Sequence, residues 1–278
     1  MPNVLIVGAT RGLGYELTQQ YVRKGYTVFG TARSEPKNPD PKVHWITGVD
    51  VAEESAGQRI ATGLNGQQQD LVIITAGYFP KESLEEPNWE AEVLTYKTSA
   101  IAPVFLTHHL HQAGLLRTAT DGTTGSKLII VSSESGSITL RHETEGGGLY
   151  AHHASKAASN MVAKLLALDL KDSGIAVVAV HPGFMRTDMT AGVGFDRFWD
   201  VGGAVTPDVA ARSLVDWVER DLDMRKTGQY WAPRGAADIG TAEAVLGKKK
   251  EELPTLCSCL GEGWDVDLCV RCNYLWSV

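Results

Sequence analysis

Cysteine is absent from most of this chain. The sequence has 278 residues, and its four cysteines all follow residue 256, at Cys257, Cys259, Cys269 and Cys272. The first 256 residues can therefore form neither a disulfide bond nor a site in which cysteine binds a metal. The four cysteines could bind zinc, but the gap between the two pairs is shorter than in most zinc modules. We therefore expect no metal, and an apolar terminal flap or an ill-ordered tail.

Long hydrophobic runs and an excess of positive charge are also lacking. The longest apolar run, residues 175–180, is far shorter than the roughly 20 residues of a membrane-spanning helix. The apolar run near the N-terminus is too short for a secretory signal. Lys and Arg total 26 against 33 Asp and Glu, and the net charge of −7 disfavours binding to nucleic acid. We expect a cytoplasmic protein that binds neither membranes nor nucleic acid.

Short apolar segments alternate with segments of helical period along the chain. Runs that are apolar on both faces predict the strands of a parallel sheet covered by helices, at residues 4–8, 27–31, 44–47, 71–75, 127–132 and 175–180. Helical patterns cover residues 13–23, 53–64, 89–116, 151–170 and 207–220. This alternation predicts an α/β fold, a Rossmann-type doubly wound parallel sheet in a single domain. We expect the catalytic domain over residues 1–253 and an extension over residues 254–278.

A glycine-rich segment connects the first predicted strand to the first predicted helix. Its glycines allow a tight turn and let backbone N–H groups approach a pyrophosphate, to which the helix N-terminus adds a favourable dipole. Glycine also marks ordinary turns, but this position in a βα series favours a dinucleotide. We assign to cofactor binding the loop residues Gly8, Thr10, Arg11, Gly12, Leu13 and Gly14.

The residue that follows the second predicted strand indicates which dinucleotide binds. An acidic residue there would bind the ribose 2′-hydroxyl, whereas Arg33 suits a 2′-phosphate and favours NADP(H) over NAD(H). The alternative is that Arg33 is a solvated loop cation. Asp50 and Val51, after the third strand, could flank the adenine. Ala76 and Gly77, after the fourth, could let the backbone pass close to the cofactor.

With these features the chain resembles a short-chain dehydrogenase/reductase, from about residue 4 to residue 246. The resemblance also rests on Ser132-Ser133, on the run Ala154-Ser155-Lys156-Ala157-Ala158, and on residues 181–189. The last segment is similar to the family's Pro-Gly segment over the nicotinamide. Residues 136–138 and 147–151 most resemble the C-factor-like, sniffer-type carbonyl reductases. The cofactor contacts that the resemblance implies here come from Lys156, Pro182, Gly183, Met185 and Thr187.

The resemblance also implies where the catalytic residues lie. The family uses an Asn, a Ser, a Tyr and a Lys, of which Ser133 and Lys156 match the Ser and the Lys. The position four residues before the lysine, where the family has its tyrosine, is His152. The asparagine of the helix after the fourth strand is replaced by Ser99, and that of the Asn-Ala-Gly motif by Thr75. The active site is therefore atypical.

A histidine beside a lysine behaves differently from a tyrosine. The charge of Lys156 should lower the pKa of His152, and a neutral imidazole is a base rather than an acid. This favours alcohol oxidation, or a non-redox isomerase, dehydratase or cyclase in which His152 is the general base. A rival hypothesis gives the acid/base role to Tyr150, although residues two apart on a helix point to different faces. A third is a non-catalytic NADP-binding protein.

Aromatic and apolar residues indicate the substrate and the assembly. Phe195, Phe198 and Trp199 lie where the family has a mobile lid, and suggest a small apolar or aromatic carbonyl or alcohol as substrate. The predicted helix 151–170 is apolar nearly all round. The corresponding helix of the family pairs with a partner subunit, which implies a homodimer or homotetramer. His108 and His111 share a helix face, but nothing nearby completes a metal site.

Overall fold

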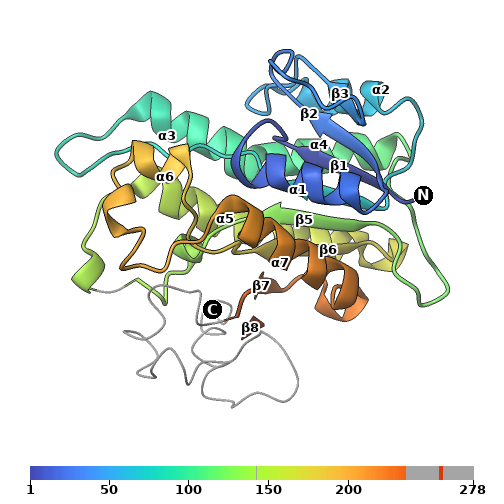
Figure 1. Ribbon diagram of the computed structural model, residues 1–278. Helices are drawn as coiled ribbons and strands as arrows, with labels where there is room; N and C mark the ends of the chain where they lie inside the picture. The colour runs from blue at the N-terminus through green and yellow to red at the C-terminus, as the bar shows by residue number, and fades with distance from the viewer. Residues whose placement is uncertain (142, 236–256, 259–278) are drawn as a thin grey trace.

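The computed structural model describes residues 1–141, 143–235 and 257–258, and these build one doubly wound α/β domain (Figure 1). At its centre is an eight-stranded sheet of order β3-β2-β1-β4-β5-β6-β7-β8. The first seven strands run parallel, and β8 pairs antiparallel with β7. The strands are β1 (Asn3–Val7), β2 (Thr27–Thr31), β3 (Val43–Ile46), β4 (Leu71–Ile74), β5 (Lys127–Val131), β6 (Ala176–Val180), β7 (Tyr230–Ala232) and β8 (Cys257–Ser258).

Helices cover both faces of the sheet, which explains why the central strands are apolar on both sides. On one face Leu17 and Trp217 join the core, and on the other Ile60 and Leu106 do so. All four residues of β4 are buried. The first face carries α1 (Gly12–Arg23) and α7 (Pro207–Arg220), and the second carries α2 (Ala56–Gly63), α4 (Ala102–Gln112) and α5 (Tyr150–Leu170).

The strand order reverses at β1, and this positions the site. β1 pairs with β2 on one side, where Val4 is opposite Val28, and with β4 on the other, where Val4 is opposite Leu71. Connections leave the carboxyl ends of β1 and β4 in opposite directions, so a crevice opens between them. Ligands of doubly wound sheets bind at this switch point.

The helix predicted over residues 89–116 is interrupted. It consists of α3 (Trp89–Tyr96), a π-helical turn (Lys97–Ile101) and α4, which ends two residues before Gly114. The Thr98 side chain hydrogen-bonds back to the carbonyl of Leu94, and such bonding within a helix competes with the backbone ladder. Gly114 has φ +65°, a left-handed conformation that stops a helix. The wide turn places Ser99 at the break.

The described residues can be compared with the expectations that this protein neither crosses a membrane nor binds a metal. Among the described residues, none of the helices combines the length and the apolar character needed to cross a bilayer. Within the same residues there is no group of three side chains that could hold a metal ion. Cys259, Cys269 and Cys272, on which a zinc site would depend, lie outside the described residues.

Candidate active site

The glycine loop forms a tight backbone cradle at the carboxyl end of β1. Gly8 and Gly12 have φ of +91° and +53°, a region that side chains rarely tolerate. A Cβ on Gly14 would lie 2.1 Å from the carbonyl oxygen of Gly8, so only glycine fits there. Leu13 is buried, whereas Thr10 and Arg11 are exposed at the start of α1. The loop therefore presents backbone N–H groups and a helix N-terminus with little side-chain cover.

The end of β4 is tied to this loop by Thr75. Its hydroxyl donates to the carbonyl oxygens of Val7, at 2.9 Å, and Gly8, at 3.1 Å. A Cβ on Gly8 would lie 3.0 Å from the backbone nitrogen of Ala76, and one on Gly77 would lie 3.9 Å from Nζ of Lys156. Ala76 thus lies beside the glycine loop, and Gly77 lies beside Lys156.

The residues assigned to the adenosine half lie at the carboxyl ends of β2 and β3. Arg33 is exposed two residues after β2. The backbone N–H of Val49 donates to the carbonyl of Ala32 at 3.0 Å, which joins the two strand ends. The Asp50 carboxylate accepts from the N–H of Ala52 at 3.0 Å, and Val51 packs against the core. This arrangement leaves the guanidinium of Arg33 accessible to an anion.

The Pro-Gly segment after β6 closes over the glycine loop. Pro182 and Gly183 are buried, and Gly183 has φ +102°. Thr187 caps the short helix α6 (Asp188–Gly192) in a capping box with Thr190. A Cβ on Gly12 would lie 3.8 Å from Cγ2 of Thr187. Met185 pairs with Val205 and packs against the core, so this segment is fixed at both ends.

Lys156 lies buried on α5 against the end of β5. Its Nζ donates to the carbonyl oxygen of Val131 at 2.8 Å, and burial lowers its pKa to about 8. Ser132 donates to the carbonyl oxygen of Lys156 at 3.4 Å. A Cβ on Gly136 would lie 2.6 Å from the backbone of Lys156, so the turn after β5 packs directly on α5.

Two serines bring hydroxyl groups to this region. Ser133, half-buried after β5, donates to Oγ of Ser135 at 3.1 Å and accepts from its N–H at 3.2 Å. Ser99 lies in the π-helical turn and is 3% exposed, and its hydroxyl has no hydrogen-bond partner. A buried hydroxyl without a partner is costly, so Ser99 is available to a group that enters the site.

His152 lies one helical turn before Lys156 and is 8% exposed. Its ring stacks on that of Phe79, with centroids 3.8 Å apart and planes at 19°. Burial, and then the charge of Lys156, lower the pKa of His152 well below its usual value, with smaller contributions from His153 and Arg141. Sequence reasoning gave this direction from Lys156 alone, whereas burial is the larger cause.

Tyr150 takes a different direction from His152. It is the first residue of α5 and is 39% exposed. Its hydroxyl lies 3.8 Å from where a Cβ on Gly147 would be, which directs the ring toward the loop before the helix. Leu149, with φ 54°, makes the left-handed entry into α5. The side chain of Tyr150 therefore lies against the loop before α5, while the side chain of His152 is buried.

Sequence reasoning missed two residues in the segment after β4. Phe79 stacks on His152 and also contacts the edge of Phe195, with centroids 5.7 Å apart. Glu82 is 6% exposed; its carboxylate accepts from the N–H of Ala151 and its carbonyl from the N–H of Leu149 at 3.3 Å. Neither has a sequence signal, because the contacts join positions about 70 residues apart.

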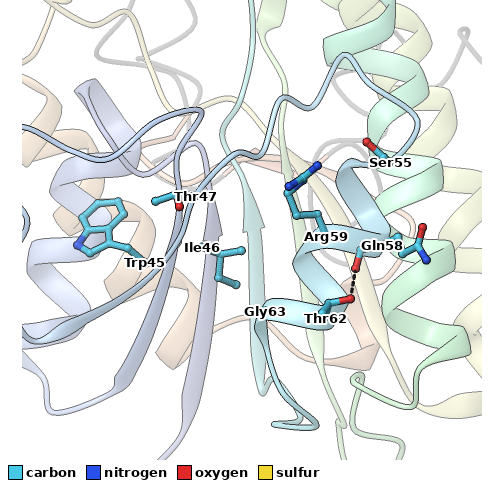
Figure 2. A pocket seen from close by; sticks show the side chains of 8 residues that line it. All are labelled: Trp45, Ile46, Thr47, Ser55, Gln58, Arg59, Thr62 and Gly63. Atoms are coloured by element: carbon cyan, nitrogen blue, oxygen red, sulfur yellow. Dashed lines mark hydrogen bonds between the residues drawn. The ribbon is translucent and has the colours of Figure 1, made fainter.

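A hollow lies away from these residues, at the edge of the sheet. Figure 2 shows that its lining comes from β3 and α2 and the residues beside them. Thr62 donates to the carbonyl of Gln58 at 2.9 Å along α2. A Cβ on Gly63 would lie 2.7 Å from the Ile46 side chain, so helix and strand are in close contact. None of the residues assigned to catalysis lines this hollow.

Comparison with known proteins gives a family and several relatives. The family model described as short chain dehydrogenase matches residues 2–197. The chain is 27% identical over 235 residues to 1-hydroxy-2-glutathionyl-2-methyl-3-butene dehydrogenase of Rhodococcus sp. (strain AD45), an alignment covering 83% of this chain and 96% of the relative. It is 25% identical over 199 residues to serine 3-dehydrogenase of Rhizobium radiobacter, covering 67% of this chain and 73% of the relative.

Solved structures agree on the fold. The NADPH-bound carbonyl reductase from chicken fatty liver has a TM-score of 0.71 at 23% identity, covering 84% of this chain and 96% of the other. The putative carbonyl reductase Sniffer of Caenorhabditis elegans has a TM-score of 0.68 at 24% identity, covering 84% and 97%. These similarities confirm the single Rossmann-type domain and include the sniffer-type branch.

Proposed function

Given that this chain belongs to the short chain dehydrogenase family and is an oxidoreductase of that type, we propose that it uses NADP(H) to interconvert small apolar or aromatic carbonyl compounds and alcohols. The observation that carries the proposal is the convergence of the glycine loop, Gly77 and Lys156 at the switch point. A dinucleotide cradle and a buried lysine in the same crevice suit redox chemistry on a small substrate.

The residues present fit a dinucleotide. A Cβ on Gly14 would clash with the carbonyl of Gly8, so the loop packs tightly on the start of α1, whereas a Cβ on Gly12 would meet nothing closer than 3.8 Å, so the backbone there is open to a ligand. The N–H groups of this loop would hold the pyrophosphate, Arg33 the 2′-phosphate, and Asp50 and Val51 would flank the adenine. Lys156 would hold the ribose hydroxyls, and the segment from Pro182 to Thr187 would lie over the nicotinamide. When bound, the cofactor supplies or accepts a hydride.

The side chains around Lys156 would orient the substrate. Ser133 offers a hydroxyl that can donate a hydrogen bond to the substrate oxygen. Lys156, with a pKa of about 8, keeps a positive charge near neutral pH and favours negative charge on that oxygen. Ser99 adds a buried hydroxyl without a partner. In this proposal His152 takes the role that the family gives to its tyrosine.

Aromatic rings support an apolar or aromatic substrate. Phe79, Phe184, Phe195 and Phe198 form a chain of ring contacts with centroid separations of 5.7 to 6.4 Å that begins at His152. Aromatic walls with a few polar groups are typical of small-molecule sites. The names of the relatives, a dehydrogenase of an alcohol and two carbonyl reductases, support the interconversion of carbonyl and alcohol groups.

A non-redox reaction is the second candidate function. The lowered pKa of His152 keeps its imidazole neutral, and a neutral imidazole can remove a proton. An isomerase, dehydratase or cyclase of this fold would then need no net hydride transfer. Absorbance at the reduced-nicotinamide band during turnover separates the two candidates. Product formation without a change at that band would reject the redox proposal.

The cofactor preference is testable at Arg33. Loss of a guanidinium that pairs with a phosphate costs about 1.5–3 kcal/mol, so Arg33→Ala should raise the KM for NADPH about 10- to 100-fold. The KM for NADH should change by less than about twofold. Steady-state kinetics with both cofactors and 4-nitrobenzaldehyde give the comparison, and Lys37→Ala, an exposed cation in the same loop, is the matched control. Equal effects of Arg33→Ala on both cofactors would contradict the assignment.

A further inference from the structure

The two ring nitrogens of His152 have different surroundings. Nδ1 is fully buried and has no hydrogen-bond partner. The Phe79 ring lies parallel to the imidazole at 3.8 Å and covers one of its faces. The side chain keeps 8% exposure, which leaves Nε2 as the nitrogen that can meet a substrate. Which nitrogen carries the proton in such a ring is set by the hydrogen bonds that the other nitrogen makes.

From this asymmetry we propose that His152 is held as the neutral tautomer with its proton on Nε2 and donates a hydrogen bond to the substrate oxygen. A proton on Nδ1 would be a buried donor without an acceptor, which is rarer in proteins than a buried acceptor without a donor. The inference rests on the proposed function, because it assigns the donor that the absent tyrosine would supply. His152 is then a catalytic residue that contacts the substrate without losing its proton.

This tautomer suits the step in which charge develops on the substrate oxygen. When a hydride reaches the carbonyl carbon, negative charge develops on the oxygen, and a fixed N–H aimed at that oxygen stabilises it. The alkoxide then takes its proton from solvent, because His152 keeps its own. The same N–H stabilises the same charge when the alcohol is oxidised, so His152 is a hydrogen-bond donor in both directions and not a general base.

The segment after β4 holds the ring in this state. Phe79 stacks on the imidazole and makes a T-shaped contact with Phe195. Glu82 caps the first turn of α5 through its carboxylate and its carbonyl, and so fixes the backbone at Ala151 and Leu149, on either side of the first helical residue. Phe79 and Glu82 are thus positioning residues for His152.

The charged groups near His152 also keep it neutral. Lys156 lies on the next turn of α5, His153 beside it, and Arg141 in the loop before the helix, and all three disfavour a second proton on the imidazole. Burial lowers the pKa of the neighbouring His153, and the charges of Glu134 and Glu82 oppose this lowering only in part. Arg141 is itself paired with Glu145 at 2.8 Å. The ring of His152 should therefore stay singly protonated through neutral pH.

Nitrogen NMR tests the tautomer without any substrate. The full-length protein, labelled with 15N-histidine, contains eight histidines, and the His152 signals are those missing from the spectrum of His152→Gln. We expect an unprotonated Nδ1 and a protonated Nε2, unchanged from about pH 6 to about pH 8. Protonation of Nδ1, or of both nitrogens at neutral pH, would overturn the proposal whether or not the enzyme proves to be a reductase.

Two substitutions test the donor. Glutamine can place an N–H near the position of Nε2 but cannot act as a base, whereas alanine can do neither. For reduction of 4-nitrobenzaldehyde by NADPH, kcat of His152→Gln should stay within about tenfold of wild type and that of His152→Ala should fall about 100- to 1000-fold. Equal loss in both variants, with folding confirmed by circular dichroism, would point to a base and reject the donor.

A substitution of Phe79 tests whether its stacking on His152 holds the imidazole in one tautomer. Phe79→Leu uncovers the ring face and should let the NMR signals of His152 average between the two tautomers, with a pKa closer to its usual value. Phe198→Leu is the matched control, since that ring contacts Phe195 and not His152. A single Nε2–H tautomer that persists in Phe79→Leu would reject the positioning role of Phe79.

Discussion

At the scale of single residues, the buried positive charge of Lys156 lowers the free energy of unfolding. Burial lowers its pKa from 10.5 to about 8. This lowering of the pKa corresponds to about 3 kcal/mol. Because the pKa is lowered in the fold, the penalty is present in full below about pH 8 and is lost as the pH rises toward the unfolded value of 10.5.

Lys156→Met should therefore stabilise the protein while it removes activity. The neutral side chain avoids the buried charge but loses the hydrogen bond to Val131, so we expect a net gain of about 1–2 kcal/mol at pH 7. This corresponds to a rise in Tm of about 2–8 °C. Denaturant unfolding at pH 7 and at pH 10 is the measurement, and the gain should shrink at pH 10. Lys171→Met, at an exposed position after α5, is the control; equal gains at both positions would contradict the argument.

His152 and Thr75 show which features of the site the sequence predicted and which it did not. The spacing of four residues predicted that His152 lies one helical turn from Lys156, and the positive charge of Lys156 predicted that the pKa of His152 is lowered. The stack on Phe79 and the sealing of Nδ1 depend on a tertiary contact that no local pattern encodes. Thr75 was predicted to end the fourth strand and to replace an asparagine of the family, but the bond of its hydroxyl to the glycine loop was not predicted.

At the scale of elements, α4 and α5 present an apolar surface to solvent. Met161, Leu165 and Leu168 on α5 are 43%, 51% and 59% exposed, and Val104 and Phe105 on α4 are about as exposed. The resemblance to the family motivates a second copy of this chain as the partner that covers this surface. We propose a homodimer or homotetramer formed through it.

Charge on this surface should separate the subunits. Burying a leucine contributes about 1.5–3 kcal/mol, so Leu165→Asp combined with Leu168→Asp should weaken association at least about 100-fold and give monomers. Light scattering coupled to size-exclusion chromatography reports the mass. Val201→Asp, at an 85% exposed residue outside the two helices, should leave the mass unchanged. A monomeric wild type would contradict the proposal directly.

Elements were predicted well where the apolar period was regular. The six predicted strands all form, because runs such as Leu71–Ile74 are apolar on both faces. The break near Ser99 was missed, since residues 89–116 keep a helical period through the π-helical turn. The three-residue strand β7 was missed as well, because so short a segment forms a strand only through its pairing with β6.

At the scale of the whole molecule, the described strand β8 lies at the edge of the sheet. All residues assigned to catalysis and cofactor binding precede α6, and β7 lies between β8 and β6, the strand before the assigned segment Pro182 to Thr187. Deletion of residues 254–278 should therefore change turnover by less than about twofold. It removes β8 from the edge of β7 and should promote aggregation, because an unpaired edge strand is exposed.

Two deletions separate these effects. Removal of residues 259–278 alone keeps Cys257 and Ser258, which form β8, and should aggregate less than removal of residues 254–278. NADPH oxidation and static light scattering on matched samples measure the two properties. Loss of turnover in a deletion variant that stays monodisperse would show that the extension takes part in the reaction.

The strand order also sets how long β1 remains without its packing partners during synthesis of the chain. β1 leaves the ribosome first, but one of its edges is paired by β4 and the face it shares with α1 is covered by α7, which ends at Arg220. At about 5–20 residues per second, roughly 200 further residues take about 10–40 s to appear. Throughout that interval the growing polypeptide carries an uncovered apolar layer, and β1 also has an open edge until Ile74 completes β4. Its demand for chaperones is thus greatest before α7 is made.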